Sequence, residues 1–401
     1  MTRRMIAALM AVTLTGWLLP VQASPLPFQW RRAIGTTLAD VATDGTGFTV
    51  VTGERPVDEY GGFLVAAFDR SGTKLWQDVW KPIRDEPAGT TGKAVTIGPD
   101  GNVYVAGFGW HCLYGCESGG WFIRAYARDG SLRWTRQAAG WKTRPRQSEA
   151  TGIDSWSGGL AITGFEYDDM VGPTDSWIRA YGLDGAFAWK TRVRVAAGTD
   201  VRVATADLAI GPAGSLFVAG YVERDLGLDT SDQESFIAGF GPNGERRWTR
   251  VIRERGDQDE DAAVAVDVRG TTLVVAGELC THVPGSSESP TRGWLSQLSL
   301  QGDVRWTQTW GGEQTPDVED VALAADGKVV TIGSAGTGSF AVALVLRTFT
   351  GSGEPDGRQV LDPVRGGLRG AGVAVDAVGA SLVGNRQLKG SSGVDGRLWR
   401  L

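Results

Sequence analysis

Seven copies of one short pattern, an apolar run that ends in glycine, are spread along almost the whole chain. The glycines are Gly53, Gly107, Gly164, Gly220, Gly277, Gly333 and Gly384, and consecutive copies lie 51 to 57 residues apart. A period of this length indicates supersecondary units that must stack, because no single unit can bury its apolar face alone. The sequence therefore predicts a repeat architecture.

The second unit shows what one repeat contains. Short runs with period-two alternation cover residues 92–98, 102–107, 121–126 and 131–136, and Asp-Gly turns at 100–101 and 129–130 separate two pairs of them. Such turns tolerate the positive φ of tight hairpins. With 58 glycines in 401 residues, the composition also fits a chain rich in turns. Each unit is predicted to be a four-stranded antiparallel meander.

The side chains of each unit indicate which strand lies inside. The first strands carry small and aliphatic residues, as in 263–267 and 372–376, which suits strands crowded around a central axis. The fourth strands carry a large aromatic residue that we expect to pack on the neighbouring unit. These residues are Trp30, Trp76, Trp134, Trp189, Trp248 and Trp306, and Val360 takes the place of tryptophan in the sixth unit.

The two ends of the chain predict how the units close into a ring. The last unit stops after its third strand, at 397–401, whereas residues 28–32 match the fourth strand at 132–136. The N-terminal strand would complete the last unit, which leaves only short edges. We therefore predict an all-β fold, a seven-bladed β-propeller formed by one domain over 24–401. Its approximate blades are 38–80, 92–138, 149–195, 206–252, 262–310, 321–362, and 371–401 together with 26–34.

The repeat resembles a known family. Asp-Gly-x-x-x-Trp, an acidic loop, Ala-Val-Asp, Gly-x-Val-Tyr-Val-Ala-Gly and an aromatic third strand are similar to the seven-bladed β-propeller repeat (SBBP-type) of bacterial secreted and surface proteins. The resemblance covers essentially all of 24–401. It implies the fold and little about activity, because propellers host many unrelated functions.

The N-terminal segment and the net charge limit where the protein is located and what it can bind. Arg3 and Arg4, an apolar stretch over 5–19 and the small-residue site 21–23 predict a signal peptide over 1–23; an uncleaved anchor helix is the alternative. We expect a secreted or periplasmic protein without stable membrane insertion after cleavage. Loss of both arginines would change the net charge from −6 to −8, so nucleic acid is not an expected partner.

The long connections of adjacent blades are expected on one face of the disc, where function on a rigid scaffold tends to lie. Loops 107–120, 137–148 and 164–176 break the repeat with aromatic and charged residues suited to a carbohydrate or peptide ligand. The candidate ligand-binding residues are Trp110, Tyr114, Trp141, Arg144, Arg146, Tyr167, Asp168 and Asp169. The alternative is that the tryptophans cover the apolar floor of their own loops.

Cysteine and histidine are scarce, which limits the possible chemistry. Cys112 and Cys116 are expected to form a local disulfide in an exported protein, which leaves Cys280 outside that pair. A metal site from both histidines, His111 and His282, and the cysteines is disfavoured, because the loops belong to distant blades. The acidic segment 256–261 resembles the start of a calcium loop but more simply caps a strand. No cofactor or metal is predicted.

The sequence favours a binding or scaffold module without catalysis. Two other classes stay open. A lyase or hydrolase would need acid–base pairs such as Asp168 or Asp169 against Arg144 or Arg146. A structural surface protein would assemble through the face of the disc.

Overall fold

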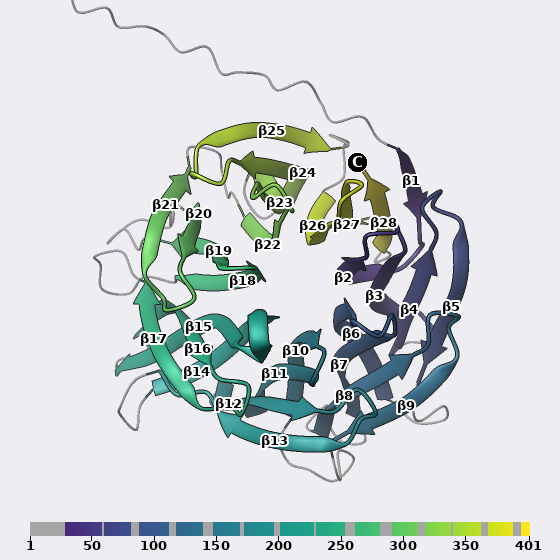
Figure 1. Cartoon of the computed structure of the whole chain (residues 1–401), viewed down its shortest axis with the longest axis horizontal. Helices are drawn as coiled ribbons and strands as arrows, with labels where there is room; N and C mark the ends of the chain where they lie inside the picture. Colours follow the sequence, from purple (N-terminus) through teal and green to yellow (C-terminus); the bar gives the residue numbers. More distant parts are fainter. Residues whose placement is uncertain are drawn as a thin grey trace, which may run out of the picture.

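The computed structural model describes residues 29–57, 60–81, 88–111, 118–138, 147–168, 172–195, 201–227, 230–252, 261–280, 291–311, 317–337, 340–361, 368–387 and 394–401. In these ranges the chain forms seven four-stranded antiparallel sheets and one short 3₁₀ turn, η1 (Pro212–Gly214). The sheets stand as blades around a central axis (Figure 1), so the predicted seven-bladed β-propeller is confirmed.

The first three blades follow the chain in order from the inner to the outer strand. Blade 1 contains β2 (Thr37–Thr43), β3 (Thr49–Arg55), β4 (Gly62–Phe68) and β5 (Lys74–Trp80). Blade 2 contains β6 (Ala88–Ile97), β7 (Val103–His111), β8 (Ser118–Tyr126) and β9 (Leu132–Gln137). Blade 3 contains β10 (Gln147–Trp156), β11 (Gly159–Asp168), β12 (Gly172–Tyr181) and β13 (Phe187–Arg192).

Blades 4 to 6 repeat this order. Blade 4 contains β14 (Val201–Ile210), β15 (Leu216–Gly227), β16 (Thr230–Phe240) and β17 (Arg246–Ile252). Blade 5 contains β18 (Ala262–Arg269), β19 (Thr272–Cys280), β20 (Thr291–Leu298) and β21 (Val304–Trp310). Blade 6 contains β22 (Asp317–Leu323), β23 (Val329–Thr337), β24 (Phe340–Phe349) and β25 (Pro355–Leu361).

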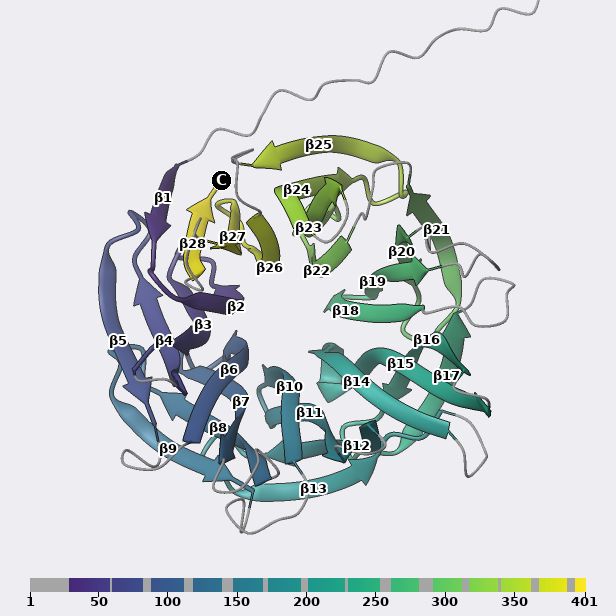
Figure 2. The same cartoon turned by 180° about the vertical axis from the view of Figure 1, so that it is seen from behind.

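Blade 7 is built from both ends of the chain. It contains β26 (Leu368–Val375), β27 (Ala380–Gln387), β28 (Val394–Arg400) and, as its outer strand, β1 (Trp30–Ala33). β1 pairs antiparallel with β28, with Trp30 opposite Arg400 and Ala33 opposite Arg397. Figure 2 shows β1 at the rim beside β28, so the predicted closure by the N-terminal strand is confirmed.

Several strands are longer than the sequence pattern predicted. β6 begins at Ala88 instead of 92, and β14 begins at Val201 instead of 206. The segments 107–120 and 164–176 were expected to be loops, but β7 runs to His111 and β8 starts at Ser118, while β11 runs to Asp168 and β12 starts at Gly172. The reason is that backbone pairing continues past the apolar residues into polar and glycine-rich segments that lack alternation.

The apolar core lies between blades. The described residues form seven buried clusters, one at each contact between adjacent blades. The cluster between blades 1 and 2, for example, contains Phe63, Phe122 and Tyr126. The Phe63 and Phe122 rings meet edge to face with centroids 5.3 Å apart. Because each blade buries its faces only against its neighbours, the ring must close to leave no apolar face exposed.

The six recurrent tryptophans fasten the outer edges of adjacent blades. Each indole N–H donates over 2.8 to 3.1 Å to a backbone carbonyl in the third-to-fourth-strand turn of the next blade, as Trp76 does to Arg128. Each ring also lies against the positive-φ glycine of that turn. A Cβ on any of these glycines would lie 2.5 to 2.8 Å from the indole; they are Gly72, Gly130, Gly185, Gly244, Gly302 and Gly353. The predicted packing between blades is confirmed.

The exception at Val360 follows from the closure. Val360 lies in the outer strand of blade 6 and would face the third-to-fourth-strand turn of blade 7. In blade 7 these two strands come from opposite ends of the sequence, so no turn glycine joins them. A tryptophan at 360 would have no such turn to cover, and Val360 remains 37% exposed.

We predict that Trp76→Ala lowers the free energy of unfolding by about 2–3 kcal/mol, because it removes a half-buried ring and an interblade hydrogen bond. Val360→Ala at the corresponding position of blade 6 should cost less than about 1 kcal/mol. Urea unfolding monitored by circular dichroism measures both values. Equal losses would contradict the role assigned to the tryptophans.

Candidate functional site

A channel with a volume of about 510 Å³ runs along the axis of the ring, and the first strands of all seven blades line it. Every one of these strands has a β-bulge at the same place. The extra residue of each bulge lies in the channel wall; these residues are Ala39, Lys93, Thr151, Ala206, Val264, Glu319 and Ala371. Only Lys93 and Glu319 are charged, so the bulge positions give the channel mouth its asymmetry.

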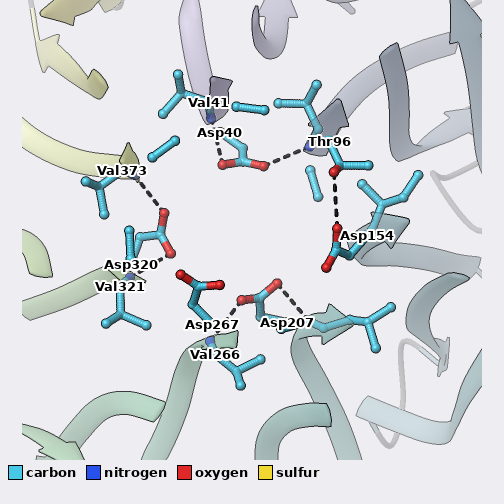
Figure 3. Close-up of a pocket in the computed structure, with 18 of the residues that line it drawn as sticks. Asp40, Val41, Thr96, Asp154, Asp207, Val266, Asp267, Asp320, Val321 and Val373 are labelled. Atoms are coloured by element: carbon cyan, nitrogen blue, oxygen red, sulfur yellow. Dashed lines mark hydrogen bonds between the residues drawn. The ribbon is translucent and has the colours of Figure 1, made fainter. Parts of the chain in front are cut away.

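Five aspartates form a ring inside the channel (Figure 3): Asp40, Asp154, Asp207, Asp267 and Asp320. Each carboxylate accepts two backbone N–H bonds. In Asp40, Oδ1 accepts from Val41 at 2.6 Å and Oδ2 accepts from Val95 of the next blade at 2.8 Å. The other bridges run over 2.6 to 2.9 Å, from Asp154 to Ile210, Asp207 to Val266, Asp267 to Leu323 and Asp320 to Val373.

The two remaining blade contacts are bridged by hydroxyl groups. Thr96 of blade 2 donates to Asp154 of blade 3 at 3.2 Å. Thr43 of blade 1 donates to Asp376 of blade 7 at 2.8 Å, and Asp376 also forms a buried ion pair with Arg400. Carboxyl groups therefore join the inner ends of adjacent blades at all seven contacts. The ring was not predicted from the sequence, although an aspartate within the first strand of most repeats was a usable signal.

Burial dominates the titration of the ring. It raises the pKa of Asp40 and of Asp207 to about 7 and that of Asp154 to about 6, against the lowering effect of the backbone N–H groups. Burial also raises the pKa of Asp267. The pKa of Asp320 lies well above its ordinary value because burial acts together with the charges of Asp40 and Asp207.

Among the residues that the structure describes, one sector at the mouth of the channel stands out, on the face that carries the connections from second to third and from fourth to first strands. We call this the long-loop face. The Nζ atom of Lys93 lies 5.5 Å from the centroid of the Phe108 ring, and the Phe108 and Trp110 centroids are 5.7 Å apart. Burial raises the pKa of Glu54 in blade 1 and of Glu149 in blade 3, and the charge of Lys93 opposes both shifts. We call Glu54, Lys93, Phe108, Trp110 and Glu149 the mouth sector.

The mouth sector arises where the repeat changes. Glu54 and Phe108 follow the repeat glycine in their second strands. At the corresponding positions of blades 5 and 7, Glu278 accepts from the Val318 amide at 3.0 Å and Asn385 accepts from the Leu38 amide at 2.7 Å. Phe108 has no polar group with which to form such a bridge. Blade 2 therefore has an aromatic ring where blades 5 and 7 have a bridging polar side chain.

Of the candidate binding residues, Trp110 alone has a described side chain. It is half-buried at the end of β7, and its ring lies over Gly89, where a Cβ would come within 2.3 Å. The ring therefore packs partly on its own blade. Tyr167 and Asp168 lie on β11, opposite Pro173 and Gly172. The others, Tyr114, Trp141, Arg144, Arg146 and Asp169, lie outside the described residues.

Most of the residues on which the disulfide, metal-site and calcium-loop predictions rest also lie outside the described residues. This holds for Cys112, Cys116, His282 and the segment 253–260. Cys280 ends β19, and its backbone N–H donates to buried Asp261 at 3.3 Å. Within the described ranges no group of three or more His, Cys, Asp or Glu residues is arranged to hold a metal ion. The same ranges contain no helix that is long and apolar enough to cross a membrane.

Comparison with known proteins supports the fold class, a seven-bladed β-propeller. No protein-family model matches the chain, and no curated protein is similar to it in sequence. Among solved structures, the polysaccharide lyase Uly1 is similar with a TM-score of 0.58 at 9% identity, covering 94% of this chain and 99% of that one. The WD40 β-propeller domain of Doa1 gives 0.52 at 11% identity, covering 93% and 96%. At these identities the likeness shows the fold alone.

We predict that the protein becomes more stable as the pH falls from 8 to 5. Because the folded-state pKa values of the ring lie above the unfolded ones, its stabilising protonation is complete below about 4 and is lost as the pH rises through about 6 to 7. Calorimetric melting across this range measures the trend. Asp207→Asn should flatten it, whereas Asp129→Asn in an exposed turn should not; a trend of opposite sign would contradict the titration.

Proposed function

We propose that the protein is an exported, non-catalytic binding module that recognises a carbohydrate through the mouth sector on the long-loop face. One observation carries the proposal: the exposed amine of Lys93 in blade 2 lies beside the Phe108 ring, and its charge acts on Glu54 of blade 1 and Glu149 of blade 3. Aromatic faces stack on sugar rings, and charged groups next to them bind hydroxyls.

The chemistry of the sector favours a neutral or weakly charged ligand. Lys93 donates hydrogen bonds, and the carboxyl groups of Glu54 and Glu149 accept them, so both polarities lie within one patch. The bulge positions of blades 3, 4, 5 and 7 carry uncharged residues, which provide fewer hydrogen-bond donors and acceptors. These residues are Thr151, Ala206, Val264 and Ala371. Binding is therefore concentrated on one side of the mouth. A peptide with polar side chains is the alternative ligand.

A catalytic role is a second candidate, because burial raises the pKa of both Glu54 and Glu149, which would allow one carboxyl group to act as an acid. In a hydrolase or lyase, these two glutamates would take the acid–base role that the sequence suggested for Asp168 or Asp169. An assay for new reducing ends or for unsaturated sugar products, run on each bound glycan, separates the two roles. Release of product that Glu149→Gln abolishes would favour catalysis.

Export is a part of the proposal that can be measured directly. We expect the protein recovered from the periplasm or medium of a bacterial host to begin at Ser24, since the small-residue site over 21–23 precedes it. Intact-mass spectrometry gives the first residue.

We predict that glycan and peptide arrays probed with residues 24–401 give hits that Trp110→Ala and Lys93→Ala weaken about tenfold or more, because each removes a ligand contact. Two variants serve as matched controls. Trp156→Ala alters a half-buried tryptophan at the opposite end of a first strand, and Lys328→Ala alters an exposed lysine paired with Asp356. Binding that responds equally to all four variants, or to none, would contradict the proposed site.

A further inference from the structure

A second cavity lies between blades 4 and 5, away from the mouth sector. Its volume is about 580 Å³, within the range of small-molecule sites. The floor is formed by buried Ser215, Phe217, Gly239 and Phe240. The walls come from turns that join first to second and third to fourth strands, which places the cavity on the face opposite the long-loop face.

Blade 2 offers a direct comparison for this place. Tyr104 and Phe217 both lie three residues before the repeat glycine, and both pack on the recurrent tryptophan of their own blade. The Tyr104–Trp134 centroids are 5.9 Å apart and the Phe217–Trp248 centroids 6.1 Å apart, with an interplanar angle of 40° in each pair. The two aromatic pairs therefore have the same geometry.

The difference lies in the polar atoms around these pairs. The Tyr104 hydroxyl donates to the Asp100 carboxylate at 2.7 Å and lies 3.4 Å from the Leu183 carbonyl of the next blade. In blade 4, phenylalanine lacks the hydroxyl, and Ala213 stands in the position of Asp100. Both polar groups that meet here in blade 2 are missing in blade 4, so this part of the wall between blades 4 and 5 is apolar and open.

The turn that borders the cavity has an unusual backbone. Ala213 has φ +57°, and it is the one residue other than glycine with positive φ among the described parts of the chain. For alanine this conformation costs on the order of 1–2 kcal/mol. Pro212 precedes it and Pro242 lies across the same wall. The wall is thus formed by rigid residues, which suits a preformed site.

The remaining lining groups define the ligand class. Trp248 and Leu300 form the other wall, and Arg247 contributes the one formal charge among the lining residues. The Arg247 guanidinium lies close to Gly241, where a Cβ would be 3.2 Å from one of its nitrogens. The nearby Glu245 carboxylate accepts from Asn243 at 3.2 Å and does not line the cavity. A flat apolar body therefore fits the walls, and an anionic group fits Arg247.

We propose that this cavity is a binding site for a planar aromatic carboxylate, with the ring between the proline wall and Trp248 and the carboxylate on Arg247. The site is independent of the mouth sector, because it uses other blades and the other face. Its ligand could be a free small molecule or the C-terminal aromatic residue of a peptide, since both present an aromatic group and a carboxylate.

The experiment uses 2-naphthoate as the probe and residues 24–401 as the protein, with ligand-observed NMR and isothermal titration calorimetry. We expect saturable binding at millimolar or lower concentration. 2-Naphthalenemethanol, which lacks the charge, should bind about tenfold more weakly. A second arm compares a peptide that ends in phenylalanine with the same peptide carrying a C-terminal amide. Binding of the peptide with the free carboxylate, but not of its amide, would favour a peptide source.

Two variants and one matched control locate the site. Ala213→Asp together with Phe217→Tyr introduces the two polar side chains of blade 2 into the cavity, and aspartate tolerates the positive φ of residue 213, so the variant should keep the melting temperature and lose naphthoate binding. Arg247→Gln should weaken binding about tenfold, whereas Arg246→Gln, on the adjacent residue that donates to the Arg194 carbonyl, should not change it. Undetectable binding to the unaltered protein, or equal binding to the filled double variant, would overturn the site. Equal effects of the two arginine variants would overturn the anionic ligand class.

Discussion

The structure depends on contacts between blades, because no blade can bury its two apolar faces alone. Six of the seven contacts have the same three layers, and the seventh has the inner two. Carboxyl and hydroxyl groups such as Asp40 and Thr96 join the inner strands, an apolar cluster fills the middle, and in six contacts a tryptophan covers the next turn at the rim. The contact between blades 6 and 7 lacks the outer layer, since the strands that would form the turn come from opposite ends of the sequence.

Much of this architecture was predictable from the sequence, because it rests on residues that recur. The repeat glycines, the Asp-Gly turns and the tryptophans gave the number of blades, and the match between the N-terminal strand and the other fourth strands gave the closure. The bulges and the aspartate ring were not predicted. A bulge has no side-chain signature of its own, and the aspartates alternate between two positions of the strand, as in Asp40 and Asp154, which obscured their common role.

The candidate sites were less predictable for a physical reason. Binding residues depart from the repeat, so periodicity cannot place them, and proximity arises only when blades meet. Glu54, Lys93 and Glu149 belong to three blades and are far apart in sequence, yet they interact at one mouth of the channel. The cavity beside Phe217 also lies where the repeat changes, because blade 4 lacks the hydroxyl and the carboxylate that meet at this place in blade 2. Recurrent residues thus hold the ring, and departures from the repeat supply the surfaces for ligands.

Hydrogen–deuterium exchange at β1 tests the closed ring most directly. The backbone N–H of Gln29 donates to Arg400 and that of Ile34 donates to Gly396, so β1 is bonded at both ends to the third strand of blade 7. If the ring is closed in this way, the bonded amides of Gln29 and Ile34 should exchange on the order of a thousandfold or more slowly than in an unstructured peptide, together with those of β28. Unprotected exchange of the Gln29 and Ile34 amides in a protein whose other blades stay protected would contradict closure by the N-terminal strand.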